Sequence, residues 1–380
     1  MDAKRATKIG IGCTVAMLIP TIILGWWAIS WARGVAKWSE KADEFPTVAE
    51  LRGEPIPDAE NAALVYEQAW EALELTEQEE ELLNTSDDPA TLAPILDANS
   101  EALALFREAA RMDKCRFEPV YEEGGDEAAI PEFPHLEGLR SLLPLLRARV
   151  DTSVASDRAS VLETVQDQVR LSGHLLQRPH GIIEYLSARS HLTQASRALG
   201  TVLIARDSTA QEADPLRLVL RELDPRKSHE VALHMEMAMG LDVIDWSEIH
   251  PKEEIAERGG RVAWKRGALW SGYLALNRST YVREMSELMD RCRRPWREIA
   301  DHDEDLPRHN LTYLFTAILL PGHSIASIRD EMLARREMML VALDIEAFIA
   351  EHGRPPESLD ELIGTQGIDD PDYALDVFSG

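Results

Sequence analysis

The chain has 380 residues and a formal net charge of −27, from 67 acidic and 40 basic side chains. This charge excludes general attraction to nucleic acid or to anionic lipid headgroups, which are also negative. Three cysteines are too few for a disulfide-built fold, and an apolar fraction of 45% predicts a folded body of one large domain or two small ones.

A transmembrane helix is predicted over residues 9–32, a run of 24 residues without a charge. At about 1.5 Å per residue such a helix spans roughly 36 Å, whereas the hydrocarbon core of a bilayer is about 30 Å thick. A basic tail (residues 1–8) precedes the run, and tryptophans gather at its far end, as in an interfacial aromatic belt. A cleaved secretory signal is the alternative, although the run is longer than the usual apolar region of a signal peptide.

Orientation is not decided by the flanking basic residues, because three Lys or Arg lie on each side of the run. The signal-anchor pattern favours an amino terminus inside the cell. We therefore expect a single-pass protein of the inner (plasma) membrane whose soluble domain is extracytoplasmic. Residues 9–32 would contact the lipid bilayer.

A juxtamembrane stalk and linker is predicted over residues 33–58, since Pro46, Gly53, Pro55 and Pro57 favour an extended chain. From residue 59 the apolar period is helical. In the first helix Ala62, Tyr66, Ala69, Trp70 and Leu73 share one face. Further helices are predicted near 135–150, 157–177, 181–206, 215–223, 226–245, 270–292, 310–320 and 324–352.

Helix ends are marked by three Asp-Pro pairs, at Asp88, Asp214 and Asp224, where the carboxylate caps the helix and proline takes the first position. Gly353 followed by Pro355 predicts the end of the long helix, and Ser358 opens a short final one. Sustained strand alternation is absent from the sequence. The predicted fold class is all-α, with a helical-hairpin and possibly solenoid-like domain at residues 59–338, resembling tetratricopeptide-type stacks.

No catalytic, cofactor-binding or metal-binding residue is predicted. His229 and His234 lie five apart, about 140° around a helix, whereas the zinc-protease motif needs a spacing of four. The acidic run at 301–305 with His302 lacks the glycine and spacing of a calcium loop. No nucleophile elbow, Walker loop or dinucleotide fingerprint occurs.

A basic, aromatic island at residues 258–297 is the candidate interaction surface, because it holds 10 basic and 3 acidic side chains while residues 40–132 hold 26 acidic and 6 basic ones. The candidate residues are Trp264, Arg266, Trp270, Tyr273, Arg293, Arg294 and Trp296. The alternative is that the island packs on the chain's own acidic helices. Cys115 and Cys292 form either one disulfide or two free, buried thiols.

The C-terminal segment (residues 339–380) resembles the region after the long helix of type II secretion major pseudopilins. The matching residues are Ala342-Leu343-Asp344, Phe348, His352-Gly353-Arg354-Pro355-Pro356, Leu359-Asp360-Glu361-Leu362 and Asp376-Val377-Phe378-Ser379-Gly380. The chain departs from that family in lacking the prepilin cleavage motif and in stopping where the family's sheet begins. A shortened reading frame ending at Gly380 stays open.

The whole chain resembles bacterial membrane-anchored helical envelope proteins that combine an N-terminal anchor, a Pro-Asp-x-Glu-Asn-Ala-Ala start (here residues 57–63) and this pseudopilin-like tail. We therefore predict a membrane-anchored scaffold that binds protein partners, without nucleic acid or cofactor. The alternatives are an accessory component of a type II secretion or pilus-like machine, and a hydrolase with a dispersed site.

Overall fold

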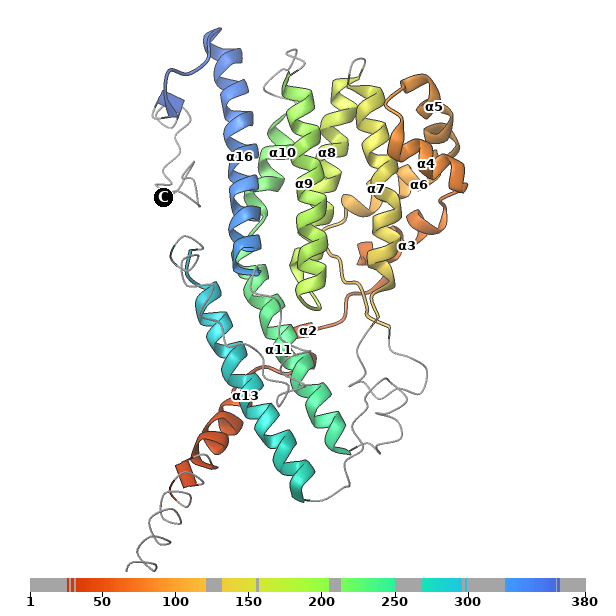
Figure 1. Cartoon of the computed structure of the whole chain (residues 1–380). Coiled ribbons are helices and arrows are strands. Elements are labelled where there is room, and N and C mark those ends of the chain that lie inside the picture. The colour runs from red at the N-terminus through yellow and green to blue at the C-terminus, as the bar shows by residue number, and fades with distance from the viewer. Residues whose placement is uncertain are drawn as a thin grey trace, which may run out of the picture. The chain divides into compact units, whose positions relative to one another are not determined.

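The computed structural model describes residues 26, 29–30, 32–120, 132–154, 157–204, 213–249, 268–295, 298, 325–359 and 361–362 (Figure 1). Within these ranges the chain is all-helical and has no strand, only the isolated β-bridges Asn61–Lys114 and Val120–Glu132. The predicted all-α class is therefore confirmed for this part of the chain. None of the helices in these ranges is long and apolar enough to cross a bilayer. Most of the predicted span 9–32 lies outside these residues.

The chain divides into two compact units. The larger comprises residues 47–239, 289–307 and 321–380, and the smaller comprises residues 1–46, 240–288 and 308–320. The helices in chain order are α2 (Val48–Arg52), the 3-10 helix η1 (Asp58–Glu60), α3 (Ala62–Glu71), α4 (Glu77–Thr85), α5 (Pro89–Ala98), α6 (Ser100–Ala110), α7 (Pro134–Ser153), α8 (Arg158–Gln177), α9 (Ile182–Ile204), α10 (Asp214–Glu222), α11 (Pro225–Ile249), α13 (Ala268–Cys292) and α16 (Ile325–His352).

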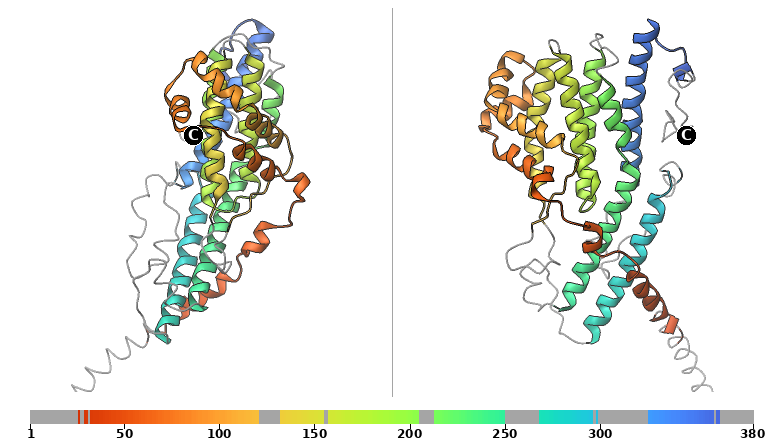
Figure 2. Two further views of the ribbon diagram at one scale, coloured as in Figure 1. Left: turned by 90° about the vertical axis from the view of Figure 1, so that its right-hand side faces the viewer. Right: turned by 180° about the vertical axis from the view of Figure 1, so that it is seen from behind.

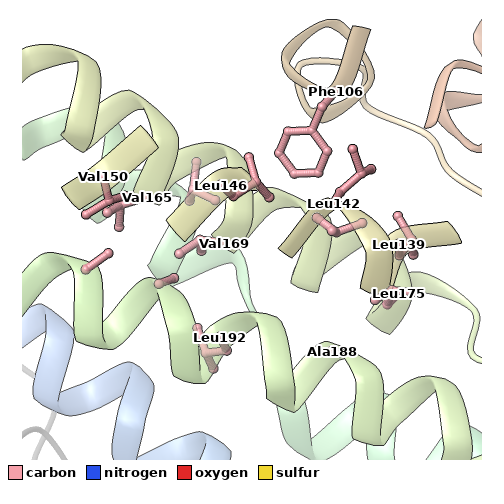
Figure 3. Close-up of a cluster of buried hydrophobic side chains, with 14 of the residues drawn as sticks. Phe106, Leu139, Leu142, Leu146, Val150, Val165, Val169, Leu175, Ala188 and Leu192 are labelled. Carbon is pink, nitrogen blue, oxygen red and sulfur yellow. The ribbon is translucent and has the colours of Figure 1, made fainter. Parts of the chain in front are cut away.

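In the larger unit α7, α8 and α9 lie side by side, and each consecutive pair runs antiparallel (Figures 1 and 2). Helices α3, α4 and α5 pack on α7, and α6 packs on α3 and α8, while α10 packs on α8 and α16 packs on α9. Figure 3 shows the core between these layers, where Phe106, Leu142, Val169 and Leu192 meet. Burial of such aliphatic side chains, at about 1.5–3 kcal/mol each, is the main force that holds the layers together.

The α3 face is buried as its spacing predicts. Ala62, Tyr66 and Ala69 are fully buried, and Trp70 is packed against the core. The Trp70 indole lies over Gly138 of α7, where an added Cβ would stand 2.3 Å from the Trp70 Cδ2 atom. A glycine inside α7 thus lets the two helices approach closely, which outweighs its poor helix propensity.

Two of the three predicted Asp-Pro caps are confirmed. Asp88 accepts the backbone N–H of Ala90 at the start of α5, and Asp224 accepts that of Lys227 at the start of α11. Asp214 does not cap α10: it is the first helical residue, and its carboxylate instead binds Arg217. The competing partner is a charged side chain three residues on, so it lies on the same helix face.

The C-terminal turn forms at Gly353, which has the left-handed φ of +69° predicted for it. Only half of the predicted capping box at Ser358 is made. The Ser358 hydroxyl accepts the Glu361 N–H, but the Glu361 carboxylate binds Arg354 and the Glu357 N–H. The charged guanidinium is the stronger partner for that carboxylate.

Two predicted boundaries differ from the structure. Residues 33–58 are not simply extended, because 32–42 are helical and α2 forms with a Thr47–Glu50 capping box. The predicted start of the pseudopilin-like segment at residue 339, which lay within the predicted helix 324–352, falls inside α16, where Met339, Leu340 and Leu343 belong to the hydrophobic core. Helix α16 is thus part of the body and does not begin a separate segment.

Candidate functional site

A buried polar cluster of the larger unit surrounds Glu184, in the first turn of α9. The Glu184 side chain is 2% exposed. His135 Nε2 lies 2.7 Å from its Oε1 atom, and His180 Nδ1 lies 3.3 Å from the same oxygen. The backbone N–H of His180 donates to Oε2 at 2.6 Å. One buried carboxylate is thus shared by two imidazoles and an amide.

Local structure brings these groups together from three elements. Pro134 begins α7 and places His135 in its first turn. His180 precedes α9 in the short α8–α9 connection, where Gly181 has φ +146°. A Cβ on Gly181 would stand 2.8 Å from Glu236 Oε1, so only glycine fits there without a shift. Phe117 then stacks on His135 at 4.5 Å between ring centroids.

Burial by itself would raise the pKa of Glu184, but the hydrogen bonds from His135 and His180 outweigh it, so the pKa lies below the usual value. The carboxylate is therefore ionised and held by the imidazoles. Cys115 lies within electrostatic reach of it. Burial, and then the negative charge of Glu184, raise the pKa of the Cys115 thiol well above its ordinary value. The thiol is protonated and enclosed, which is not the state of a cysteine nucleophile.

A second buried cluster begins at the next residue, Tyr185, whose hydroxyl donates to the Pro225 carbonyl at 3.1 Å. Its ring meets that of His229 at 5.0 Å between centroids. Arg329 and Asp330 pair at 2.5 Å and are both largely buried. These groups fill the junction of α9, α11 and α16 within the larger unit. They form a buried, hydrogen-bonded polar cluster.

Three buried histidines are held neutral. Burial lowers the pKa of His174, His191 and His229 to about 4 each. His174 Nδ1 pairs with the Tyr66 hydroxyl at 3.1 Å, and His229 Nε2 lies 3.2 Å from the Ile325 carbonyl oxygen. Nδ1 of His191 has no hydrogen-bond partner among the residues that the structure describes. Among the described residues, no three His, Cys, Asp or Glu side chains are arranged to hold a metal ion.

The predicted interaction surface is described only in part. Arg293 is exposed, but it forms ion pairs within the chain, with Glu230 at 2.8 Å and with Asp290 at 3.1 Å. Arg294 is exposed, and its carbonyl accepts from Arg329. The side chains of Trp264, Arg266, Trp270, Tyr273 and Trp296 lie outside the described residues, as does the run at 301–305.

The described arginines of the island favour its packing on the chain's own acids. In the smaller unit Arg278 binds Asp43 and Asp245, each at 3.2 Å, and the Ser39 carbonyl. It thereby holds helix 32–42 against α13. Cys115 and Cys292 are both free and buried, so the structure has two thiols and no disulfide between them.

Two arginines near the Glu184 cluster were not singled out by the sequence. Arg116 and Arg178 both bind carbonyls of residues 52–54, in the segment that we call the strap (residues 47–57). Both guanidiniums lie far from the strap along the chain, and no local motif marks such a contact. The Glu184 cluster has only the weak signal of His180 and Glu184 at a spacing of four.

The fold and these clusters define an all-helical body with a buried layer of ionisable side chains. Comparison with protein-family models, curated proteins and solved structures finds no match for the chain.

Proposed function

We propose that this protein is a membrane-tethered helical scaffold of the cell envelope, which binds a protein partner and performs no chemistry of its own. The observation that carries the proposal is the docking of the chain that follows the uncharged run. In the smaller unit Arg278 fixes helix 32–42, and in the larger unit Arg116 and Arg178 fix the strap. Arginine contacts that fix the chain just after the uncharged run suit a protein that is displayed at a membrane.

The buried ionisable groups support a structural role for the body. The Glu184 carboxylate is already bound by His135 and His180, and the thiol of Cys115 is protonated. Burial likewise raises the pKa of the Cys292 thiol to about 12. A hydrolase that uses either cysteine would need a thiolate within reach of substrate. The hydrolase alternative therefore gains no support from these clusters.

The arrangement of α7, α8 and α9 supports a hairpin stack of the solenoid type, because consecutive antiparallel helices present a broad outer surface for partners. We place the partner surface on the island at 258–297 and the bilayer contact at residues 9–32. The body is proposed to lie on the extracytoplasmic side of the inner membrane.

Alkaline carbonate extraction tests the tether. The full chain is expected to stay with the membrane pellet, and a variant lacking residues 9–32 is expected to be released. Release of the full chain, or a mature protein whose sequence begins near residue 31 or 33, contradicts a retained tether.

Affinity purification after chemical crosslinking in intact cells tests the partner. The full chain is expected to retain a reproducible envelope protein that is lost when Arg266 and Trp270 are replaced by alanine. Replacement of Arg221 and Leu218, which are exposed on α10, is the matched control. Turnover of a substrate by the purified chain would instead favour the hydrolase.

A pilus-like or type II secretion machine is a second candidate, which the C-terminal turn favours. Arg354 binds Glu361, its guanidinium lies 5.6 Å from the centre of the Phe348 ring, and Leu359 nearby is 45% exposed. Deletion from residue 339 would remove core residues of α16, so the test uses a chain ending at residue 362. Secretion or pilus subunits that co-purify with the full chain only would support docking through the tail.

A further inference from the structure

The strap is held on the larger unit by two guanidinium groups that share its carbonyl oxygens. Nη1 of Arg178 donates to the carbonyls of Arg52 and Glu54, at 3.0 Å each. Nη1 of Arg116 donates to the same two carbonyls at 3.4 and 3.2 Å, and to that of Gly53 at 3.4 Å. Two positive charges therefore converge on one small group of acceptors.

Those acceptors are neutral. Arg178 forms no ion pair with the described part of the chain. Arg116 pairs through Nε with Glu118 at 2.6 Å, which leaves Nη1 to the strap alone. With the strap docked, the Arg116 side chain is only 9% exposed, so its charge is largely desolvated while its Nη1 faces neutral carbonyls alone. Leaving such a charged donor unsatisfied is costly, and an incoming acceptor would be favoured.

A guanidinium binds an anion more strongly than a neutral carbonyl, since the hydrogen bonds are then charge-assisted on both sides. Phosphate oxygens in particular match two convergent arginine side chains. We propose that Arg116 and Arg178 form a binding site for a phosphate-type anion, which the strap occupies in the described state. Strap docking and anion binding then exclude each other. This site does not depend on the proposed scaffold function.

A substitution at Gly53 can disfavour the docked strap without altering the two arginines that would bind the anion. Gly53 has a left-handed φ of +64°, and a Cβ there would stand 2.9 Å from Arg178 Nη1. Gly53→Ala therefore disfavours the docked strap without removing either guanidinium. If the strap competes with the anion, this substitution must strengthen anion binding, because apparent affinity rises with the fraction of chains whose site is free.

The experiment uses the full chain in neutral detergent and inorganic phosphate as the probe. Calorimetry measures affinity, and hydrogen exchange follows the backbone amides of residues 47–57. Phosphate is expected to speed exchange of the strap in the unmodified chain. Gly53→Ala is expected to bind phosphate about tenfold more tightly. Arg178→Gln, added to Gly53→Ala, is expected to abolish binding, whereas Arg221→Gln on α10 removes the same charge elsewhere and changes nothing.

Far-UV circular dichroism and the urea midpoint show that each variant is folded. An unchanged or weaker phosphate affinity of Gly53→Ala overturns the proposal. So does binding that survives Arg178→Gln, or strap exchange that is unaffected by saturating phosphate.

A second arm uses nanodiscs with and without anionic phospholipid, in the absence of phosphate. Faster strap exchange in the anionic discs identifies a lipid headgroup as a source of the anion. If exchange speeds up only on adding phosphate, the ligand is a free phosphate compound. The absence of either response contradicts the site.

Discussion

Replacing His191 by leucine should make the larger unit resistant to acid over a defined pH range. His191 is 1% exposed on α9, and burial alone lowers its pKa to about 4 from the ordinary 6.5. Leucine has a similar volume and does not titrate, so at pH 7.5 the substitution should change stability by less than about 1.5 kcal/mol.

The size of the effect follows from proton linkage. Between pH 6.5 and 4 the unfolded imidazole binds a proton that the folded one refuses, so stability is lost as the pH falls through this range. At pH 5 the loss is about 2 kcal/mol for a pKa lowered from 6.5 to about 4. With His174 and His229, which have the same pKa, the sum is about 6 kcal/mol, comparable with the whole stability of a domain.

Pulse proteolysis of the full chain in detergent, at increasing urea concentration, measures this difference at pH 7.5 and pH 5. The unmodified chain is expected to lose about 2 kcal/mol more than the His191→Leu variant between the two pH values. His234→Leu is the positional control, because His234 is only half-buried on α11 and its Nδ1 lies 2.9 Å from the Glu230 carbonyl oxygen. Equal losses in the unmodified chain and His191→Leu would refute a neutral, buried His191.

Three further substitutions test the packing and the buried charges, each by the urea midpoint of the full chain at pH 7.5. Gly138→Ala should destabilise by about 1–2 kcal/mol, because the new Cβ meets Trp70 and the cost of overpacking exceeds the gain in helix propensity; an unchanged midpoint would mean that the indole moves freely. Glu184→Gln should cost about 3 kcal/mol and should flatten the loss of stability below pH 4.5, where the unfolded form of the unmodified chain takes up a proton on this carboxylate before the folded form does; a neutral outcome would contradict the shared carboxylate. Arg217→Ala should cost about 3 kcal/mol, because it removes the guanidinium that lies 2.9 Å from the buried carboxylate of Asp344, and a double variant with Asp344→Asn should recover part of that loss.

Helix positions were largely predictable because apolar spacing and punctuation are local. Helices α7, α8 and α9 begin and end within three residues of the predicted positions. The turn at Gly353 was predictable for the same reason, since a left-handed residue before two prolines ends a helix. Asp214 shows the limit of local rules. Its cap lost to Arg217, which is itself oriented by Asp344 more than a hundred residues away.

The candidate site was not predictable, since it is built from long-range contacts. His180 and Glu184 are four residues apart, but His135 meets them only because α7 packs against α9. The prolines of the strap predicted an extended linker, which missed helix α2 within it and gave no sign of Arg116 and Arg178. The basic island likewise shows from sequence that positive charge gathers there, but not which residues or partners that charge binds. For Arg278 and Arg293 the partners are the chain's own acids, as one of the two interpretations had it.

The most direct test of a tethered scaffold is photo-crosslinking in intact cells from single positions of the chain. A photoreactive residue placed at 266 or 270 is expected to capture one reproducible envelope protein, and the same residue at exposed Glu80 of α4 is not. Capture that is equal at all positions, or that yields only abundant unrelated proteins, would contradict the proposal that this chain binds a partner through its basic island.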